Sequence, residues 1–171
     1  GSPQRQLKSG SLRTEDGANF LSDKSFRKDG TREREGLRLA DGTYQIDFYF
    51  ADGTRLERHQ LVSADGKPLI EQVYRDNGAL KGFTQVDATG KMTITTYYVD
   101  GKTESILLVP STYYENTTAT YYFPDGVTVS RKIEWTSYST NADYFRQDGT
   151  RRLSYAESNY SSGSMVWIRY D

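Results

Sequence analysis

Cysteine is absent from the 171-residue sequence, and histidine occurs once, at His59. Without cysteine the chain can form no disulfide bond, no thiolate nucleophile and no zinc–thiolate site. A zinc site would have to combine His59 with carboxylates alone, so we expect neither a metal ion nor a cofactor. Secreted eukaryotic modules of this size often carry disulfides, and their absence therefore favours a bacterial source.

The sequence also lacks an excess of charge of one sign and a long apolar run. It contains 22 Lys and Arg residues against 23 Asp and Glu residues, which leaves a net charge of −1. A chain with this balance has no overall field that would attract nucleic acid or an anionic membrane surface. No stretch approaches the apolar length that a membrane-spanning helix needs. We therefore expect no nucleic-acid partner and no transmembrane segment.

The start of the chain leans basic and is poor in apolar residues, which is typical of a solvated segment. Gly1 and Ser2 are typical of the remnant of an expression tag. The sequence therefore predicts a tag remnant and solvated lead-in over residues 1–25 and one folded domain over residues 26–171.

Glycine is spaced regularly along this domain. The intervals alternate between 23 and 25 residues, and the members of the series are Gly30, Gly53, Gly78, Gly101, Gly126 and Gly149. Each glycine closes a phrase in which one or two aromatic residues precede Asp-Gly or Asn-Gly, as in Tyr97-Tyr98-Val99-Asp100-Gly101. A fixed internal period indicates an array of short structural repeats.

A second set of turn signals lies between these glycines, with Gly17, Gly42, Gly66 and Gly90 as its clearest members. Taken together, the two sets mark a turn about every twelve residues, which leaves strands of roughly seven to nine residues. Asp-Gly supports the positive φ angles of type I′ hairpin turns or of a type I turn with a following bulge, and we expect positive φ at Gly30, Gly53, Gly101, Gly126 and Gly149. Short strands between evenly spaced turns predict an all-β fold.

Apolar and polar side chains alternate within these strands. Tyr44, Ile46, Phe48 and Phe50 share one expected face, and no window of helical length shows a 3.6-residue period. The pattern predicts an elongated or curled antiparallel β-meander of about a dozen strands built from hairpin repeats. Because a bare apolar face of this width is unfavourable, we expect the sheet to curl, to split into two layers or to be covered by a partner.

An aromatic residue precedes each turn of the first glycine series. The six residues are Phe26, Phe50, Tyr74, Tyr98, Phe123 and Phe145. Residues two strands apart in a sheet are separated by about 9–10 Å. We therefore expect these rings to form a row, a hydrophobic rim near one edge of the sheet.

Two short stretches resemble known repeat families. Tyr97-Tyr98-Val99-Asp100-Gly101-Lys102 and Tyr122-Phe123-Pro124-Asp125-Gly126-Val127 resemble the MORN-variant repeats of bacterial proteins, and residues 83–102 are similar to the YD repeats of Rhs-type shells. The resemblance covers residues 26–150. It implies a repeat β-sheet that binds or encloses a partner, and it implies no catalytic residue.

The residues that could carry chemistry have simpler explanations in the sequence. His59 shares its expected strand face with Arg55 and Glu57, and its segment offers no hydrogen-bonded orienting group and no dry pocket. We predict that His59 is a solvated surface residue and that the chain has no catalytic residue. The stretch from Gly101 to Thr103 matches the end of a phosphate-binding loop, but Thr96 occupies the place of the leading glycine, so a hairpin turn is expected.

Four tyrosines are candidates for binding a partner: Tyr49, Tyr97, Tyr113 and Tyr122. They fall on or near the polar face of the predicted strands, where their rings could stack against a sugar or a protein. The alternative interpretation is ordinary pairing between side chains on neighbouring strands.

The sequence therefore predicts a non-catalytic repeat β-sheet module that binds or encloses a protein or glycan partner. We expect it to belong to a larger bacterial envelope or secreted protein, located in the periplasm, on the cell surface or outside the cell. Self-association through sheet edges is a further possibility. The alternatives are a carboxylate-based glycan hydrolase or lyase on a concave sheet face and an immunity-type protein that sequesters a toxin.

Overall fold

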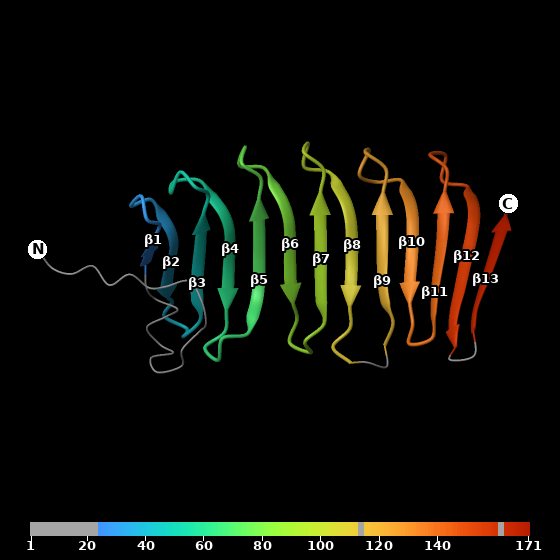
Figure 1. Cartoon of the computed structure of the whole chain (residues 1–171), viewed down its shortest axis with the longest axis horizontal. Helices are drawn as coiled ribbons and strands as arrows, with labels where there is room; N and C mark the ends of the chain where they lie inside the picture. The colour runs from blue at the N-terminus through green and yellow to red at the C-terminus, as the bar shows by residue number, and fades with distance from the viewer. Residues whose placement is uncertain (1–23, 113–114, 161–162) are drawn as a thin grey trace, which may run out of the picture. The chain divides into compact units, whose positions relative to one another are not determined.

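A computed structural model of the chain describes residues 24–112, 115–160 and 163–171. Every regular element in these residues is a β-strand, and the strand order in the sheet is the order in the sequence, from β1 to β13 (Figure 1). The all-β antiparallel meander of hairpins is therefore confirmed. All thirteen strands belong to one sheet, so the alternative of two stacked layers is wrong. The chain divides into two compact units, one ending at Pro68 and the other beginning at Leu69.

The first unit contains four strands. They are β1 (Lys24–Phe26), β2 (Arg32–Arg38), β3 (Tyr44–Tyr49) and β4 (Leu56–Val62). Its core consists of Tyr44, Ile46 and Val62, with Phe48 packed against them. Tyr44, Ile46 and Phe48 lie on one face of β3, as the alternation predicts, because successive side chains of a strand point to opposite faces. Phe50 does not share this face, since β3 ends at Tyr49 and Phe50 is the first residue of a turn.

The second unit continues the meander with nine strands. They are β5 (Pro68–Tyr74), β6 (Leu80–Val86), β7 (Met92–Tyr97), β8 (Thr103–Val109), β9 (Thr117–Tyr122), β10 (Val129–Trp135), β11 (Ser139–Phe145), β12 (Arg151–Tyr160) and β13 (Gly163–Tyr170). Among its described side chains, the buried apolar ones are Ala119 and Ala142, which flank Ile133 across β9, β10 and β11. In this unit small central side chains are buried, whereas the larger described apolar side chains stay partly accessible.

The regularly spaced glycines lie in the turns that follow β1, β3, β5, β7, β9 and β11 (Figure 1). All six have positive φ angles, between 69° at Gly53 and 87° at Gly30, so the prediction is confirmed. In the turn after β7, the Gly101 N–H donates to the Tyr98 carbonyl at 3.0 Å and the Tyr98 N–H donates to the Lys102 carbonyl at 2.8 Å. Glycine is required because other residues pay about 1–2 kcal/mol in this left-handed conformation.

The six residues of the predicted rim all lie at or beside the turns that follow odd-numbered strands, but they occupy two different repeat positions. Phe26, Tyr74 and Phe145 end a strand, whereas Phe50, Tyr98 and Phe123 are each the first residue of a turn. The equivalent strand ends are Phe26, Tyr49, Tyr74, Tyr97, Tyr122 and Phe145. The equivalent turn positions are Arg27, Phe50, Arg75, Tyr98, Phe123 and Arg146. Aromatic residues occur at both positions, so the sequence phrase alone did not separate them.

A β-bulge follows each of these six turns, in line with the alternative of a turn with a following bulge. One residue of the returning strand is left out of the pairing: Glu33, Glu57, Lys81, Glu104, Ser130 and Arg152. All six are polar, as suits an extra residue without a cross-strand partner. The bulge also resets the alternation of faces, and it thereby decides which side chains of the returning strand reach each face.

Candidate functional site

A groove of about 420 Å³ lies over β9–β13. Its polar wall comes from side chains at alternate positions, which therefore lie on one face of the sheet. Lys132 and Glu134 come from β10, Asn141 and Asp143 from β11, and Ser154 from β12. Cross-strand pairing sets Lys132 opposite Asp143 and Glu134 opposite Asn141, so the strand register itself builds the wall.

Trp167 on β13 supplies the aromatic side of this groove. It pairs across the sheet with Ala156, whose methyl group is too small to cover an indole ring. Trp167 is consequently 65% exposed. An exposed indole beside hydrogen-bonding groups can hold a flat apolar surface while its neighbours read polar substituents.

Hydrogen bonds orient both carboxylates of the groove. The Asn116 side-chain amide donates to Glu134 at 2.9 Å, and the Ser154 hydroxyl donates to Asp143 at 2.5 Å. Lys132 makes no ion pair within the described residues, and its ammonium group stays exposed. The groove therefore offers oriented acceptors and, at Lys132, an exposed cation.

His59 differs from the prediction. Its Nδ1 lies 2.7 Å from Asp47 Oδ1, and the two side chains are 25% and 19% exposed. The Gln45 amide donates to the other oxygen of Asp47 at 3.0 Å. The expectation of an imidazole without an orienting group is thus wrong, because β3 brings Asp47 directly opposite His59 on β4.

The pair formed by His59 and Asp47 does not by itself make a catalytic site. The residues two positions from His59 on its own strand, Glu57 and Leu61, offer no hydroxyl or thiol for His59 to activate. Within the described residues, Nε2 of His59 has no hydrogen-bond partner. The described residues of β3 and β4 therefore supply an oriented imidazole, and its two same-face neighbours along β4 are not nucleophiles.

Three of the four candidate tyrosines occupy one repeated position, the end of a strand. Tyr49 ends β3, Tyr97 ends β7 and Tyr122 ends β9, and all three are half-buried. The Arg32 guanidinium lies 4.9 Å from the Tyr49 ring centre and donates to its hydroxyl at 3.3 Å. Tyr113 lies outside the described residues. Tyr49, Tyr97 and Tyr122 do not line the groove, and the part of all four tyrosines in binding stays a prediction.

The aspartates of the turns are used within the turns themselves. The Arg55 side chain and the backbone N–H groups of Thr54 and Arg55 donate to Asp52, which holds the pKa of that carboxyl far below its usual value. The side chains of Lys67 and Ser63 lower the pKa of Asp65 to about 2. Hydrogen bonds to the ionised form cause both shifts. This supports the interpretation of Asp-Gly as a turn-forming element.

The groove residues were missed by the sequence analysis. The available signal was a break in alternation, because Met165 and Trp167 are apolar at positions where the polar face of β13 is expected. Their exposed fractions, 56% and 65%, show that this apolar surface faces solvent. The polar wall gave no comparable signal, since Asn, Asp and Ser are ordinary residues on a wet sheet face.

Comparisons with known proteins leave the function open. No protein-family model matches the sequence, and no curated protein is similar to it. A crystal structure of a protein of unknown function from Bacteroides fragilis NCTC 9343 is 9% identical and covers 77% of this chain and 94% of its own, with a TM-score of 0.20. In the described residues, no helix is long and apolar enough to cross a membrane.

Proposed function

We propose that the chain is a non-catalytic binding module and that the groove over β9–β13 holds a glycan. The observation that carries this proposal is Trp167, exposed to 65% beside a row of polar side chains. Sugar rings present an apolar C–H face and a rim of hydroxyl groups. An indole and a row of amide, carboxylate and hydroxyl groups complement these two features.

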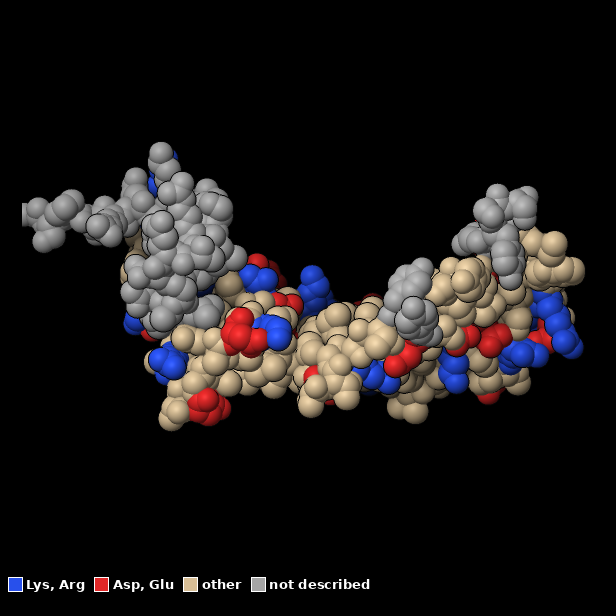
Figure 2. All heavy atoms as spheres, turned by 90° about the horizontal axis from the view of Figure 1, so that it is seen from below, with Lys and Arg blue, Asp and Glu red and all other residues tan. Residues whose placement is uncertain are grey.

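Charge favours a glycan over a highly charged ligand in this groove. Lys132 opposes Asp143 across the strands, and Glu134 lies on the same face, so neither sign dominates. Basic and acidic side chains are likewise interspersed over the surface that Figure 2 displays. This mixture supports the proposal that nucleic acid is not a partner.

The resemblance to MORN-variant and YD repeats supports the broader role of binding or enclosing a partner. On this proposal the chain works as part of a larger bacterial envelope or secreted protein. An immunity-type role, in which the sheet sequesters a toxin, is the corresponding alternative within the same resemblance.

A glycan hydrolase is a second candidate because two carboxylates line the groove. Glu134 on β10 and Asp143 on β11 occupy diagonal positions, which in an antiparallel pair lie about 7–8 Å apart at the backbone. Paired carboxylates can act as general acid and base where their carboxyl groups lie about 5–9.5 Å apart. Each of these two already accepts a hydrogen bond from a neighbouring side chain, which favours a positioning role in binding.

Titration of neutral oligosaccharides into the full chain tests the binding proposal. Cello-, xylo-, malto- and chito-oligosaccharides are suitable probes, measured by calorimetry. Trp167→Ala should weaken binding about tenfold or more, as truncation of a central aromatic commonly does. Tyr170→Ala is the matched control, because Tyr170 is an exposed aromatic on the same strand but on the opposite face. Equal losses in both variants would contradict the proposal.

Chromatography of the same mixtures separates binding from hydrolysis. We expect the oligosaccharides to remain intact after prolonged incubation. Shortened products that disappear with Glu134→Gln or Asp143→Asn would establish the hydrolase instead.

A further inference from the structure

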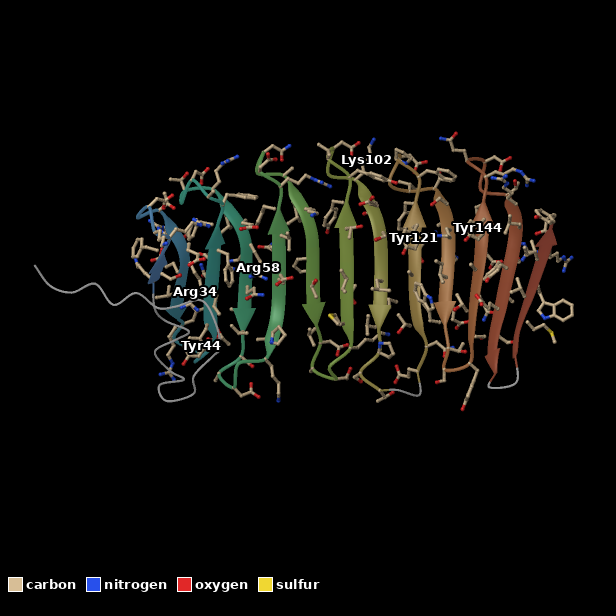
Figure 3. All side chains as sticks on the ribbon, in the orientation of Figure 1. Arg34, Tyr44, Arg58, Lys102, Tyr121 and Tyr144 are labelled. Atoms are coloured by element: carbon tan, nitrogen blue, oxygen red, sulfur yellow. The ribbon has the colours of Figure 1, made fainter. Side chains whose placement is uncertain are left out.

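The face opposite the groove carries an arginine held between two tyrosines. Arg131 on β10 pairs with Tyr121 on β9 and with Tyr144 on β11. Its guanidinium carbon lies 4.0 Å from the centre of the Tyr121 ring and 6.0 Å from that of Tyr144. Figure 3 labels the two tyrosines on the strands that flank β10. These cation–π contacts restrict the guanidinium without using its N–H donors.

Arg131 differs in this respect from other arginines of the second unit. Arg75 donates to the Tyr97 carbonyl at 2.6 Å, and Arg151 pairs with Asp171 at 2.5 Å. For Arg131, the described residues provide no hydrogen bond and no ion pair. A guanidinium has five N–H donors arranged as a fork, which fits a carboxylate through two parallel hydrogen bonds.

The surroundings of Arg131 are apolar. Ile133 and Trp135 follow it on the same face of β10, and Leu153 on β12 pairs with Tyr144. On this face of β9–β12 the single acid in the described residues is Glu157, which accepts a hydrogen bond from the Tyr155 hydroxyl at 2.6 Å. The sheet therefore provides a cation without providing its counter-ion.

We propose that this face of β9–β11 docks a protein partner that presents a carboxylate side chain flanked by apolar residues. Arg131 binds the carboxylate, and Tyr121, Tyr144 and Trp135 contact the apolar flanks. Tyr, Trp and Arg are the residues that dominate protein–protein interfaces, and apolar neighbours strengthen an ion pair by excluding water. An acidic glycan fits less well because it would need hydroxyl-binding groups where Ile133 and Leu153 lie.

The proposed docking surface of Arg131, Tyr121, Tyr144 and Trp135, called the dock below, is independent of the groove. Arg131 and Lys132 are adjacent on β10 and consequently point to opposite faces. The chain thus has two distinct recognition surfaces, a polar one for a glycan and an aromatic–cationic one for a protein.

Two matched libraries of displayed peptides test this proposal. Both libraries are screened against the full chain. Every peptide of one library has a central Glu within randomised positions, and every peptide of the other has Gln there. We expect the wild-type protein to enrich Glu peptides with apolar neighbours. Replacing the Glu of a selected peptide by Gln should weaken its binding at least tenfold.

Variants of the protein assign this binding to Arg131. Arg131→Gln should lose binding at least tenfold, and Arg131→Lys should recover only part of it because lysine lacks the bidentate fork. Lys81→Gln, the same loss of charge at an exposed bulge of the same unit, should bind as the wild type does. Thermal unfolding of each variant checks its fold, and if Arg131→Gln does not fold, the lysine variant and the Gln peptides carry the test.

Three outcomes would overturn the dock. The first is equal enrichment of the two libraries, and the second is a selected peptide whose affinity does not change in the folded Arg131 variants. The third is Arg131-dependent binding of oligogalacturonate in the absence of peptide binding, which would identify an acidic glycan as the ligand.

Discussion

Four of the six regularly spaced Asp-Gly or Asn-Gly turns are short, and two are longer by one residue. In the short turns the first N–H reaches the carbonyl four residues ahead, as from Arg146 to Thr150. In the turns around Gly53 and Gly126 it reaches five residues ahead, from Phe50 to Arg55 and from Phe123 to Thr128. One shared sequence phrase therefore produces two structures.

The two classes connect neighbouring hairpins in different ways. Each short turn begins with Arg or Tyr, whose side chain donates to a backbone carbonyl beyond its own hairpin: Arg27 to Tyr49, Arg75 to Tyr97, Tyr98 to Tyr122 and Arg146 to Asp171. Each long turn begins with Phe, which has no donor. Its glycine instead packs against the hairpin before it. A methyl group added at Gly126 would lie 2.6 Å from Lys102 Cβ, and one added at Gly53 would lie 2.6 Å from the Arg32 nitrogen.

This difference shows that the glycine serves two purposes. In every turn it permits a positive φ angle, and in the long turns it also permits close approach of the preceding hairpin. Lys102, labelled in Figure 3, is the residue that this approach brings against Gly126. Repeat arrays are stabilised largely through contacts between neighbouring repeats. The hydrogen bonds of the short turns and the close glycine contacts of the long turns therefore both contribute to the cooperativity of unfolding.

The largest difference between the classes is expected for glycine substitutions. Gly126→Ala should destabilise by about 2–4 kcal/mol, because backbone strain combines with a steric clash. Gly149→Ala should cost only about 1–2 kcal/mol, since its φ is similar but no atom lies within 4 Å of the added methyl group. Urea unfolding of both variants measures the difference. Equal losses of unfolding free energy would contradict the proposal that Gly126 also permits close approach of the preceding hairpin.

The next effect concerns the arginine of a short turn. Arg75→Met should destabilise by about 1.5–3 kcal/mol, because it removes a charge-assisted hydrogen bond to the Tyr97 carbonyl. Arg152→Met is the control, as Arg152 lies exposed at a bulge. If both variants unfold at the same urea concentration as the wild type, the contact from Arg75 does not connect the hairpins.

A smaller effect is expected where the first residue is tyrosine. Tyr98→Phe removes only the hydroxyl that donates to the Tyr122 carbonyl at 2.7 Å, and it should cost about 1 kcal/mol. The variant also places Phe, the first residue of both long turns, at the first position of a short turn. Tyr97→Phe, one residue earlier, should be neutral because the described residues provide its hydroxyl with no partner. Chemical unfolding curves that rank these two variants the other way would contradict the assignment.

The smallest effect at neutral pH is expected for the turn aspartates. Hydrogen bonds, first that from the Arg55 side chain, lower the pKa of Asp52 in the folded state below its ordinary value of 3.8. Its contribution to stability is therefore complete above that value and is lost as the pH falls toward the folded-state pKa. Asp52→Asn should lower the melting temperature at pH 7 slightly and should reduce its decline below pH 4.

Asp148 is the short-turn counterpart of Asp52. Hydrogen bonds from Thr150 lower its pKa in the same direction. Asn77 already occupies the equivalent position after β5 and accepts the Ala79 N–H at 3.0 Å, so asparagine is compatible with the turn. Melting temperatures of Asp52→Asn and Asp148→Asn between pH 7 and pH 2.5 should both decline less than those of the wild type. Acid profiles identical to that of the wild type would contradict the role of these carboxylates.

Much of the fold was accessible to prediction because its signals are local. Gly30 and Gly149 mark turns through their own backbone preference, and Tyr44, Ile46 and Phe48 mark a strand face through a two-residue period. The equivalence of Phe50 with Tyr74 was predicted wrongly because a difference of one residue changes both the position and the face. The glycines alone did not distinguish short turns from long ones.

The candidate sites depend on contacts that no local pattern specifies. Asp47 meets His59 twelve residues away, and Arg131 meets Tyr121 and Tyr144 on two different strands. These side-chain contacts follow from the strand register, and the register is determined by turn length together with the six bulges. Local chemistry therefore decides where this chain turns and which positions alternate. The groove beside Trp167 and the dock around Arg131 arise only when paired strands bring distant residues onto a common face.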